Sequence, residues 1–342
     1  MSLLEVRNLR THLLTQDGVA RAVDGVDLDI PEGEAVGVVG ESGSGKSLLA
    51  LSLLGLLPKR NCEVLEGSSV RFRGAELVGA GEKNLRRIRG REVAMVFQEP
   101  MTSLNPVYSL GNQIREALTL HRDMGRKDSA GEAVRLLEEV GIPDAAARAK
   151  AFPHQLSGGM RQRAMIAMAL AGDPSLLVAD EPTTALDVTV QVQILALLRR
   201  LQEERGMALL LISHDLRVVA QVCRTVFVMY GGRMVEQGPT SEVFPRPKHP
   251  YTRGLLGSRL SVRDRRSRLR PIPGEVPEAT AWPKGCRFHP RCAEVVQICR
   301  REEPPMVSLS LEARGGGLAL PGGGSERAAR CWFPGPEEKE GQ

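Results

Sequence analysis

The segment Gly40–Ser47 has the residue types and spacing that bind the phosphates of a nucleoside triphosphate. It follows the apolar run Ala35–Val39 and precedes a leucine-rich stretch, Ser47–Leu57, that ends at Pro58. A strand, a glycine loop and a helix in this order are the context that the pattern G-x-x-x-x-G-K-[ST] requires. The loop N–H groups and the helix N-terminus then surround an anion. The candidate binding residues are Gly40, Glu41, Ser42, Gly43, Ser44, Gly45, Lys46 and Ser47.

Two carboxylates supply the second half of such a site. The apolar run Leu176–Ala179 predicts a buried strand that ends in Asp180 and Glu181. In P-loop enzymes the lysine reaches the β and γ phosphates, and the loop serine and a strand-end aspartate hold Mg²⁺. We therefore expect Lys46 on the phosphates, Ser47 and Asp180 on Mg²⁺, and Glu181 as the general base for the attacking water. General-base catalysis contributes about 10²–10⁴ in rate.

A third segment, Leu156–Arg163, identifies the family. Its letters LSGGMRQR precede a predicted helix that runs to Ala171, so a hydroxyl and free N–H groups lie at a helix N-terminus. The segment resembles the LSGGQ signature of ABC ATPases, with methionine in place of the commoner glutamine. The resemblance implies ATP and Mg²⁺ as ligands, and it implies that the signature binds the ATP of an opposite subunit through Ser157, Gly158, Gly159 and Gln162.

The same resemblance extends to isolated positions between and after these motifs. Gln98 is similar to the Q-loop glutamine, a Mg²⁺ ligand with a catalytic role, and Asp187 to the D-loop aspartate. His214 is similar to the switch histidine at the γ-phosphate. ABC ATPases usually stack adenine on an aromatic residue before the P-loop, but no Phe, Tyr or Trp precedes Phe72. Arg21 is the candidate to stack on the base in its place.

Two further segments narrow the family to the ATPase subunits of dipeptide and oligopeptide importers. Phe97–Pro106 resembles their Q-loop, and Lys248–Leu256 resembles the HPYT segment that opens their C-terminal extension; the resemblance runs from Leu3 to Cys331. It implies a peripheral protein on the cytoplasmic face of the inner membrane, with a second ATPase subunit, two transmembrane permeases and, indirectly, an extracytoplasmic solute-binding protein. Nucleic acid is not an expected partner. The alternatives are an importer of nickel or another small solute, a soluble ABC ATPase of translation or DNA repair, and a regulatory subunit with little turnover.

Four of the six cysteines gather near the C-terminus: Cys286, Cys292, Cys299 and Cys331. Four thiolates suit a zinc ion or a [4Fe–4S] cluster, and the spacing does not choose between them. The resemblance to peptide-importer ATPases favours the iron–sulfur cluster as a staple for the extension. Cys62 and Cys223 lie in apolar or mixed segments and are expected to be packing residues.

The elements that must position these residues alternate between strands and helices, as in a mostly parallel sheet with helices on both faces. The expected fold is an α/β P-loop ABC ATPase with a mostly parallel sheet core, an antiparallel β-subdomain and an inserted helical subdomain at about 99–172. The ATPase domain is expected over residues 1–245. Residues 246–342 are expected to form an irregular extension that contains the four cysteines and, because it is rich in glycine and proline, needs a staple or a host surface.

The composition is consistent with a globular ATPase of this kind. The chain has 342 residues, 42% apolar and 25% charged, with a net charge of +5. No apolar run reaches the ~20 residues of a membrane span, and no secretory signal is expected at the N-terminus. The arginine-rich segment 259–270 is interpreted as a solvated linker, a contact with anionic lipid or a partner, or, least favoured, a nucleic-acid contact.

Overall fold

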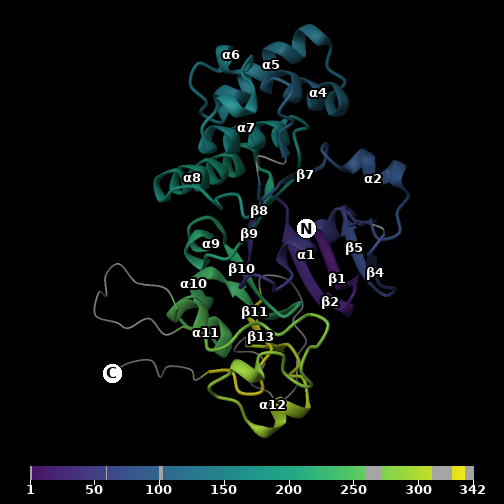
Figure 1. The fold of residues 1–342 in the computed structure, drawn as a ribbon, viewed down its shortest axis with the longest axis vertical. Coiled ribbons are helices and arrows are strands. Elements are labelled where there is room, and N and C mark those ends of the chain that lie inside the picture. Colours follow the sequence, from purple (N-terminus) through teal and green to yellow (C-terminus); the bar gives the residue numbers. More distant parts are fainter. Residues whose placement is uncertain (1, 59, 100–102, 259–270, 310–325, 336–342) are drawn as a thin grey trace. The chain divides into compact units, whose positions relative to one another are not determined.

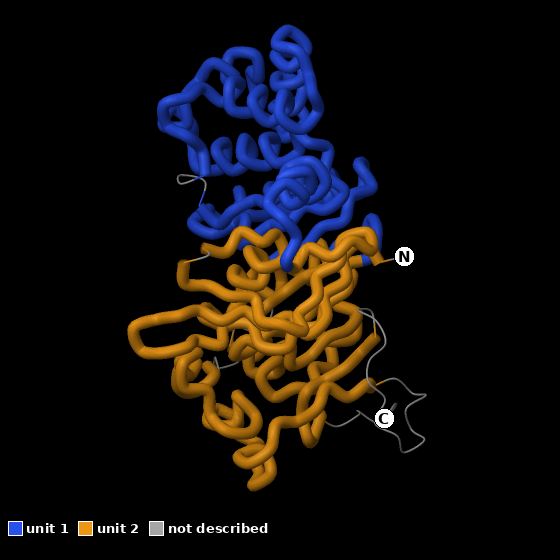
Figure 2. The backbone as a smooth tube through the Cα atoms, turned by 90° about the vertical axis from the view of Figure 1, so that its right-hand side faces the viewer, with its two compact units in different colours: residues 1, 31–35, 79–212 blue, residues 2–30, 36–78, 213–342 orange. Residues whose placement is uncertain are grey.

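The computed structural model describes residues 2–58, 60–99, 103–258, 271–309 and 326–335 (Figure 1). The arginine-rich segment 259–270 and part of the Q-loop segment, residues 100–102, lie outside the described residues. The chain forms two compact units, coloured separately in Figure 2. Unit 1 comprises residues 1, 31–35 and 79–212, and unit 2 comprises residues 2–30, 36–78 and 213–342. The extension expected at 246–342 therefore belongs to the same unit as the P-loop.

Unit 1 contains parallel strands whose side chains are buried on both faces. Strand β8 (Leu176–Asp180) pairs in parallel with β7 (Val93–Val96) on one side and with β9 (Ala208–Ser213) on the other. These runs are apolar without alternation, as expected for parallel strands covered on both faces. The prediction of parallel strands is confirmed here.

Helices make up most of the rest of unit 1. The inserted helical segment predicted at about 99–172 contains α4, α5, α6 and α7, and its main helices carry buried leucine, isoleucine, alanine and methionine at three- and four-residue spacing. The helices of the unit are α2 (Glu82–Ile88), α4 (Leu110–Arg122), α5 (Arg126–Glu139), α6 (Ala145–Arg148), the 3₁₀ turn η1 (Pro153–Gln155), α7 (Gly158–Leu170) and α8 (Val188–Arg205).

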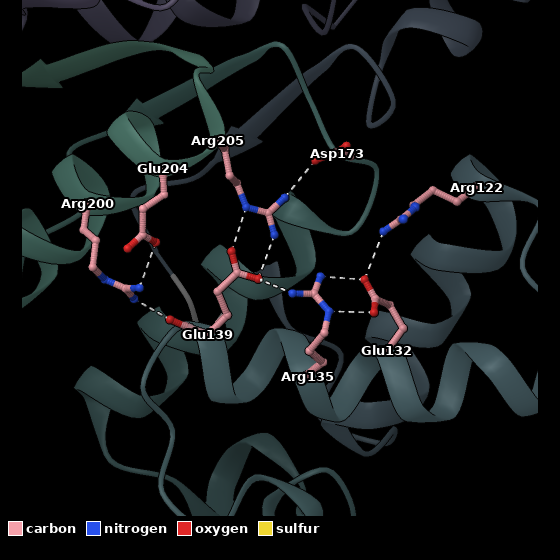
Figure 3. Close-up of polar contacts among 8 residues, drawn as sticks. All are labelled: Arg122, Glu132, Arg135, Glu139, Asp173, Arg200, Glu204 and Arg205. Atoms are coloured by element: carbon pink, nitrogen blue, oxygen red, sulfur yellow. Dashed lines mark hydrogen bonds and ion pairs between the residues drawn. The ribbon is translucent and has the colours of Figure 1, made fainter.

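A chain of ion pairs links α5 to the C-terminal end of α8 (Figure 3). Glu139 accepts hydrogen bonds from Arg205 at 2.7 and 2.8 Å and from Arg135 at 3.1 Å, and Arg205 also reaches Asp173 at 2.9 Å. Burial opposes ionisation of Glu139, but the hydrogen bonds and charges of Arg205 and Arg135 outweigh it and lower its pKa. The network therefore attaches the inserted helix α5 to α8, the helix that follows strand β8.

Unit 2 contains the predicted antiparallel β-subdomain. Strand β1 (Ser2–Thr15) pairs antiparallel with β4 (Cys62–Val64) and with β5 (Ser69–Phe72). The strand order is β2 (Gly18–Pro31), β1, β5 and β6 (Ala75–Glu76), with β4 paired to β1 off this path. Alternate residues of β1 and β2 are buried, so one face of this sheet packs on the core.

The P-loop strand of unit 2 is β3 (Ala35–Val39), which pairs in parallel with β10 (Thr225–Tyr230). Strand β11 (Arg233–Pro239) returns antiparallel to β10. Helix α1 (Lys46–Leu53) is shorter than the predicted Ser47–Leu57, because Gly55 adopts φ +60°, the left-handed conformation that ends helices. The other helices before the extension are α9 (Leu216–Val222) and α10 (Thr240–Val243).

The extension is more ordered than the sequence predicts and uses the rest of unit 2 as its host surface. Strand β13 (Ala328–Ala329) pairs with β11, and β12 (Val307–Ser308) pairs with β13. The two-residue strands were not recognisable from apolar patterning because their hydrogen bonds go to distant segments. The helical elements of the extension are α11 (Pro250–Gly257), the 3₁₀ turn η2 (His289–Arg291) and α12 (Gln297–Arg301).

No helix in the described ranges has both the length and the apolar character needed to cross a membrane.

Candidate functional site

The P-loop backbone lies too close to its neighbours to accept side chains at two of its glycines. A Cβ on Gly40 would lie 2.2 Å from the carbonyl oxygen of Met229, and a Cβ on Gly45 would lie 2.2 Å from that of Ala22. Gly45 also has φ +104°, a conformation that L-residues rarely adopt. The loop between β3 and α1 is therefore fixed by contact with β2 and with the end of β10, within unit 2.

Lys46 points its ammonium group into the centre of this loop. Its Nζ donates hydrogen bonds to the carbonyl oxygens of Gly40 and Glu41, both at 2.9 Å, and the side chain is buried. The N–H of Gly232 donates to the carbonyl of Ser44 at 2.9 Å, which holds the loop from the β10–β11 turn. This arrangement places a cation at the centre of a glycine loop that leads into a helix N-terminus, a setting that binds phosphate.

The predicted general base has a defined environment in unit 1. Glu181 has φ +45°, and its N–H donates to the carbonyl of Ile212 at 2.9 Å. Its carboxylate accepts from the amide of Gln98 at 3.2 Å and from the Thr184 hydroxyl at 2.8 Å. The structure thus brings Gln98 and Glu181 together, and it adds Thr184, which the sequence analysis did not single out. Asp180, the preceding residue, is buried at the end of β8.

The signature segment forms the N-terminus of α7. The Ser157 hydroxyl accepts a hydrogen bond from the Met160 N–H at 3.3 Å and so caps the helix. A Cβ on Gly159 would lie 2.7 Å from Val190 Cγ1, so this position is closed to larger residues, whereas one on Gly158 would make an ordinary 3.5 Å contact with Leu186. Gln162 is only 1% exposed in the single chain, and its contact with the ATP of an opposite subunit stays a prediction.

The remaining predicted residues lie at element ends. Asp187 caps α8 by accepting from the Val190 N–H at 2.9 Å, and the neighbouring Val188 is 77% exposed. His214 is exposed directly after β9 and belongs to unit 2. Arg21 uses its backbone to hold the extension, because its N–H donates to Ala279 and its carbonyl accepts from the Trp282 indole, each at 3.0 Å. Its contact with adenine stays a prediction.

The P-loop also receives two side chains from the extension, which the sequence analysis missed. The Glu41 N–H donates to the Tyr251 hydroxyl at 2.8 Å, and the Glu41 carboxylate accepts from Arg291 at 2.6 and 3.1 Å. The buried Glu236 in β11 accepts from the N–H groups of Lys248 and His249 at 2.8 and 2.9 Å, which seats the HPYT segment. The sequence predicts the HPYT segment only as a family resemblance. The hydroxyl of Tyr251 is the signal in it that could have suggested a polar contact with the P-loop.

The four clustered cysteines line one pocket in unit 2, together with Phe288, His289 and Trp332. All six cysteines of the chain are free thiols. Burial, and then the nearby Cys299, Cys331 and Cys292, raise the pKa of Cys286 to about 11. Within the described ranges, no three His, Cys, Asp or Glu side chains converge as they would to hold a metal ion. The pocket therefore gathers the four sulfurs without placing three of them as ligands of one ion.

His289, considered as a substitute ligand because it lies between Cys286 and Cys292, also lines the pocket. Its Nδ1 lies 3.0 Å from the carbonyl oxygen of Cys286, so this nitrogen is engaged with the backbone. His249 is the other histidine there; burial and the charges of Arg253 and Arg330 lower its pKa to about 3, and its Nδ1 accepts from the Tyr251 N–H at 3.0 Å. His249 is thus a neutral helix cap. Of the two cysteines expected to be packing residues, Cys223 is buried and Cys62 is partly exposed.

The Gly159–Val190 contact yields a test of the signature geometry. We expect Gly159→Ala to destabilise the protein by about 1–3 kcal/mol, the cost of forcing an extra methyl into a packed site. Addition of Val190→Ala to the Gly159→Ala variant should restore most of that loss, because it removes the opposing methyl groups. Gly158→Ala is the matched control and should be neutral or slightly stabilising, because alanine favours helix by up to about 1 kcal/mol. Urea unfolding measures all three; equal effects at both glycines would contradict the close contact.

Comparison with known proteins agrees with this geometry. The family described as ABC transporter matches residues 23–184, and the oligopeptide/dipeptide transporter C-terminal region matches residues 235–299. A putative peptide import ATP-binding protein of Brucella melitensis is 49% identical over 319 residues, which cover 90% of this chain and 94% of the relative. A probable peptide ABC transporter ATP-binding protein of Sinorhizobium fredii is 47% identical over 334 residues, or 96% and 94% of the two chains.

Solved structures share the fold. A dimeric ATP-binding cassette in a post-hydrolysis state, bound to ADP and Pi, has a TM-score of 0.62 and 27% identity and covers 69% of this chain and 98% of its own. The protein cbiO1 of Clostridium perfringens, part of an ABC transporter complex, has a TM-score of 0.60 and 27% identity, with 71% and 91% covered. The chain is therefore an ATPase of the ABC transporter family and belongs to the branch that carries the oligopeptide/dipeptide transporter C-terminal region.

Proposed function

We propose that this ATPase powers the import of short peptides across a cell membrane. The observation that carries the proposal is the C-terminal region: residues of the segment that matches oligopeptide/dipeptide transporters, Tyr251 and Arg291, bind the P-loop itself. The near full-length relatives are named for peptide import, and this supports a peptide as the solute. The solute contacts other subunits, so the choice among peptides is not made by this chain.

For the hydrolysis step we assign roles to the residues at the element ends. The P-loop amides and Lys46 would bind the β and γ phosphates, and Ser47, Asp180 and Gln98 would hold Mg²⁺, which supplies positive charge to those phosphates. Glu181 accepts a proton from the water that attacks the γ-phosphorus, as the bond from that phosphorus to the β–γ bridging oxygen breaks. The hydrogen bonds from Gln98 and Thr184 orient the Glu181 carboxylate. His214 contacts the γ-phosphate.

We further propose that two ATPase subunits act as a pair. Each chain has a single P-loop and a single signature, and the signature lies at an exposed helix N-terminus where Ser157, Gly158 and Gly159 are available to a second subunit. The exposed Val188 and Val192, beside Asp187 at the start of α8, supply apolar surface for such a contact. Similarity to a cassette solved as a dimer supports the pairing. The second subunit is an identical copy or a paralogue.

The helical segment of unit 1 offers a groove for a membrane-spanning partner. Val107, Tyr108 and Phe152 line it and are 71%, 54% and 37% exposed, and Arg115 and Lys150 add positive charge. An amphipathic helix in a cytoplasmic loop of a permease, with apolar residues and an acidic side chain, fits this combination of surfaces. Docked there, the permeases would hold the ATPase at the cytoplasmic face of the membrane, and movement of the Gln98 region would be transmitted to them.

The pocket of four cysteines is proposed to hold a [4Fe–4S] cluster, with zinc as the alternative. A tetrahedral zinc site requires sulfurs within about 3.8 Å of each other, as follows from Zn–S bonds of about 2.3 Å. In a cluster each thiolate binds a different iron, so the sulfurs lie farther apart. The pocket gathers four cysteine side chains, which is the ligand set of either centre, and the resemblance to peptide-importer ATPases favours the cluster. Cys286, Cys292, Cys299 and Cys331 would hold it, and it would link the segments of the extension.

The hydrolytic role is tested by Glu181→Gln, which keeps the size of the side chain and removes the base. We expect the rate of ATP hydrolysis to fall by about 10²–10⁴ while ATP binding persists, measured as phosphate release and nucleotide affinity. Glu203→Gln, an exposed position on α8, is the control and should retain the full rate. A Glu181→Gln protein that turns over as fast as the parent would exclude this residue as the base.

The partner surface is tested by Tyr108→Asp, which places a charge among the exposed apolar residues of the groove. We expect at least about a 30-fold weaker association with the permeases, the effect of losing an aromatic anchor of about 2 kcal/mol. The measurement is the yield of co-purified polytopic proteins from gently solubilised membranes. Leu120→Asp, which changes an apolar residue that is 71% exposed on α4 and lies outside the groove, should leave this yield unchanged. Equal losses in both variants would rule out the groove.

The metal proposal is tested by elemental analysis of anaerobically purified protein. We expect about four iron atoms per chain and visible absorbance from a cluster, with both reduced in Cys292→Ser and retained in Cys62→Ser, whose cysteine lies outside the pocket. One zinc atom per chain, without iron, would show that the four cysteines hold zinc instead of a cluster. A chain with neither metal would refute the site.

A further inference from the structure

The second residue of the P-loop, Glu41, is held by residues that follow it by 210 and 250 positions in the chain. Its backbone N–H donates to the hydroxyl of Tyr251 at 2.8 Å. Its carboxylate accepts two hydrogen bonds from Arg291, from Nη1 at 2.6 Å and from Nη2 at 3.1 Å. Because phosphate binding depends on the directions of the loop N–H groups, the extension helps to determine the shape in which this loop meets a nucleotide.

Arg291 is itself held in one conformation. Its side chain is only 5% exposed, and its Nε donates to the carbonyl of Pro273 at 2.9 Å. The guanidinium lies over the ring of Tyr230, 5.8 Å from the centroid. Separation of a buried arginine from its bidentate carboxylate partner is strongly unfavourable, because it leaves an uncompensated buried charge. The position of Arg291 and that of Glu41 therefore change together.

The other end of this contact is the cysteine pocket. Arg291 directly precedes Cys292 and closes the turn η2, which starts three residues after Cys286. Backbone hydrogen bonds run through the turn, from the His289 N–H to Cys286 at 3.0 Å and from the Cys292 N–H to His289 at 3.3 Å. A change that moves the backbone of Cys286 or Cys292 therefore moves this turn, and with it the base of the Arg291 side chain.

A second path connects the same two places. Phe288 forms part of the pocket wall and is 3% exposed. Its ring packs against Tyr230 and Tyr251, with centroids 5.2 and 5.4 Å away, and Tyr251 carries the hydroxyl that accepts from Glu41. The wall of the cysteine pocket is thus in direct contact with both aromatic residues that adjoin the Glu41 site.

We propose that Arg291 is a positioning residue that couples the cysteine pocket to the P-loop, so that nucleotide binding and the intact pocket stabilise each other. The coupling goes beyond ATP hydrolysis and rests only on nucleotide binding by the P-loop. Coupling between two binding equilibria is reciprocal. Disturbance of the cysteines therefore weakens nucleotide binding, and a bound nucleotide protects the cysteines.

The test uses the full chain after a chelator and dialysis have removed any bound metal, so that the four cysteines are free thiols as in the structure, with Mg-ADP as the nucleotide and iodoacetamide as the thiol probe. Mass spectrometry follows alkylation of Cys292 with and without saturating Mg-ADP, and calorimetry measures the affinity for Mg-ADP. In the parent we expect Mg-ADP to slow alkylation at least about 5-fold, the lower end of common coupling factors. In Arg291→Gln we expect the affinity to fall by a similar factor and the protection to disappear.

Two variants separate positioning from general destabilisation. Arg291→Lys keeps the charge but cannot form the two-pronged contact, so it should recover only part of the affinity and of the protection. Arg300→Gln removes an exposed arginine beside Cys299 and should behave as the parent in both measurements. If Arg291→Gln does not fold, Glu41→Gln breaks the same pair from the P-loop side and should abolish the protection.

The outcomes distinguish the coupling from the ATPase role. Equal alkylation rates with and without Mg-ADP, in a parent chain whose binding of Mg-ADP is measured directly, overturn the coupling and leave the ATPase proposal intact. Protection that persists in Arg291→Gln or in Glu41→Gln also overturns it. A parent chain that binds no Mg-ADP overturns both proposals.

Discussion

The close approach of backbone to backbone around the P-loop is the constraint on which the nucleotide half of unit 2 depends. Gly40 and Gly45 lie against carbonyl groups of Met229 and Ala22, with no room for a side chain. The loop is therefore shaped by the strands β2 and β10 as much as by its own glycines. Lys46 then fills the centre of the loop, where its ammonium group is surrounded by carbonyl oxygens.

The extension completes this arrangement from the opposite direction. The buried Glu236 binds the backbone of Lys248 and His249, which places Tyr251 beside the P-loop. A second attachment follows Cys286, where Arg287 pairs with Asp24 of β2 and with the carbonyl of Gly231. Because its buried arginines Arg287 and Arg291 pair with carboxylates of the β-subdomain and of the P-loop, the extension forms part of the structure that supports the nucleotide site.

Unit 1 has the two carboxylates proposed for hydrolysis at the end of the buried strand β8, and ion pairs join the inserted helix α5 to α8. Glu181 leaves β8 in a left-handed conformation and is oriented by Gln98 and Thr184. The ion pairs around Glu139 and Arg205 bind α5 to α8. A polar attachment of this kind is more sensitive to charge and solvent than an apolar core, which suits a segment that is proposed to move against its membrane partners.

The sequence by itself determined the family, the P-loop, the strand-end carboxylates and the alternation of elements, because each is encoded within a short window of residue types and spacing. Helix α8, for example, starts after a capping aspartate and ends at a left-handed glycine, both of which are local features. Only the tertiary structure decided that Gln162 is buried, that α1 ends early at a left-handed glycine, and that β12 and β13 join β11. The contacts of Tyr251 and Arg291 with Glu41 are likewise visible only in the tertiary structure. They join residues more than two hundred positions apart, and no local pattern records which distant side chain will meet a given loop.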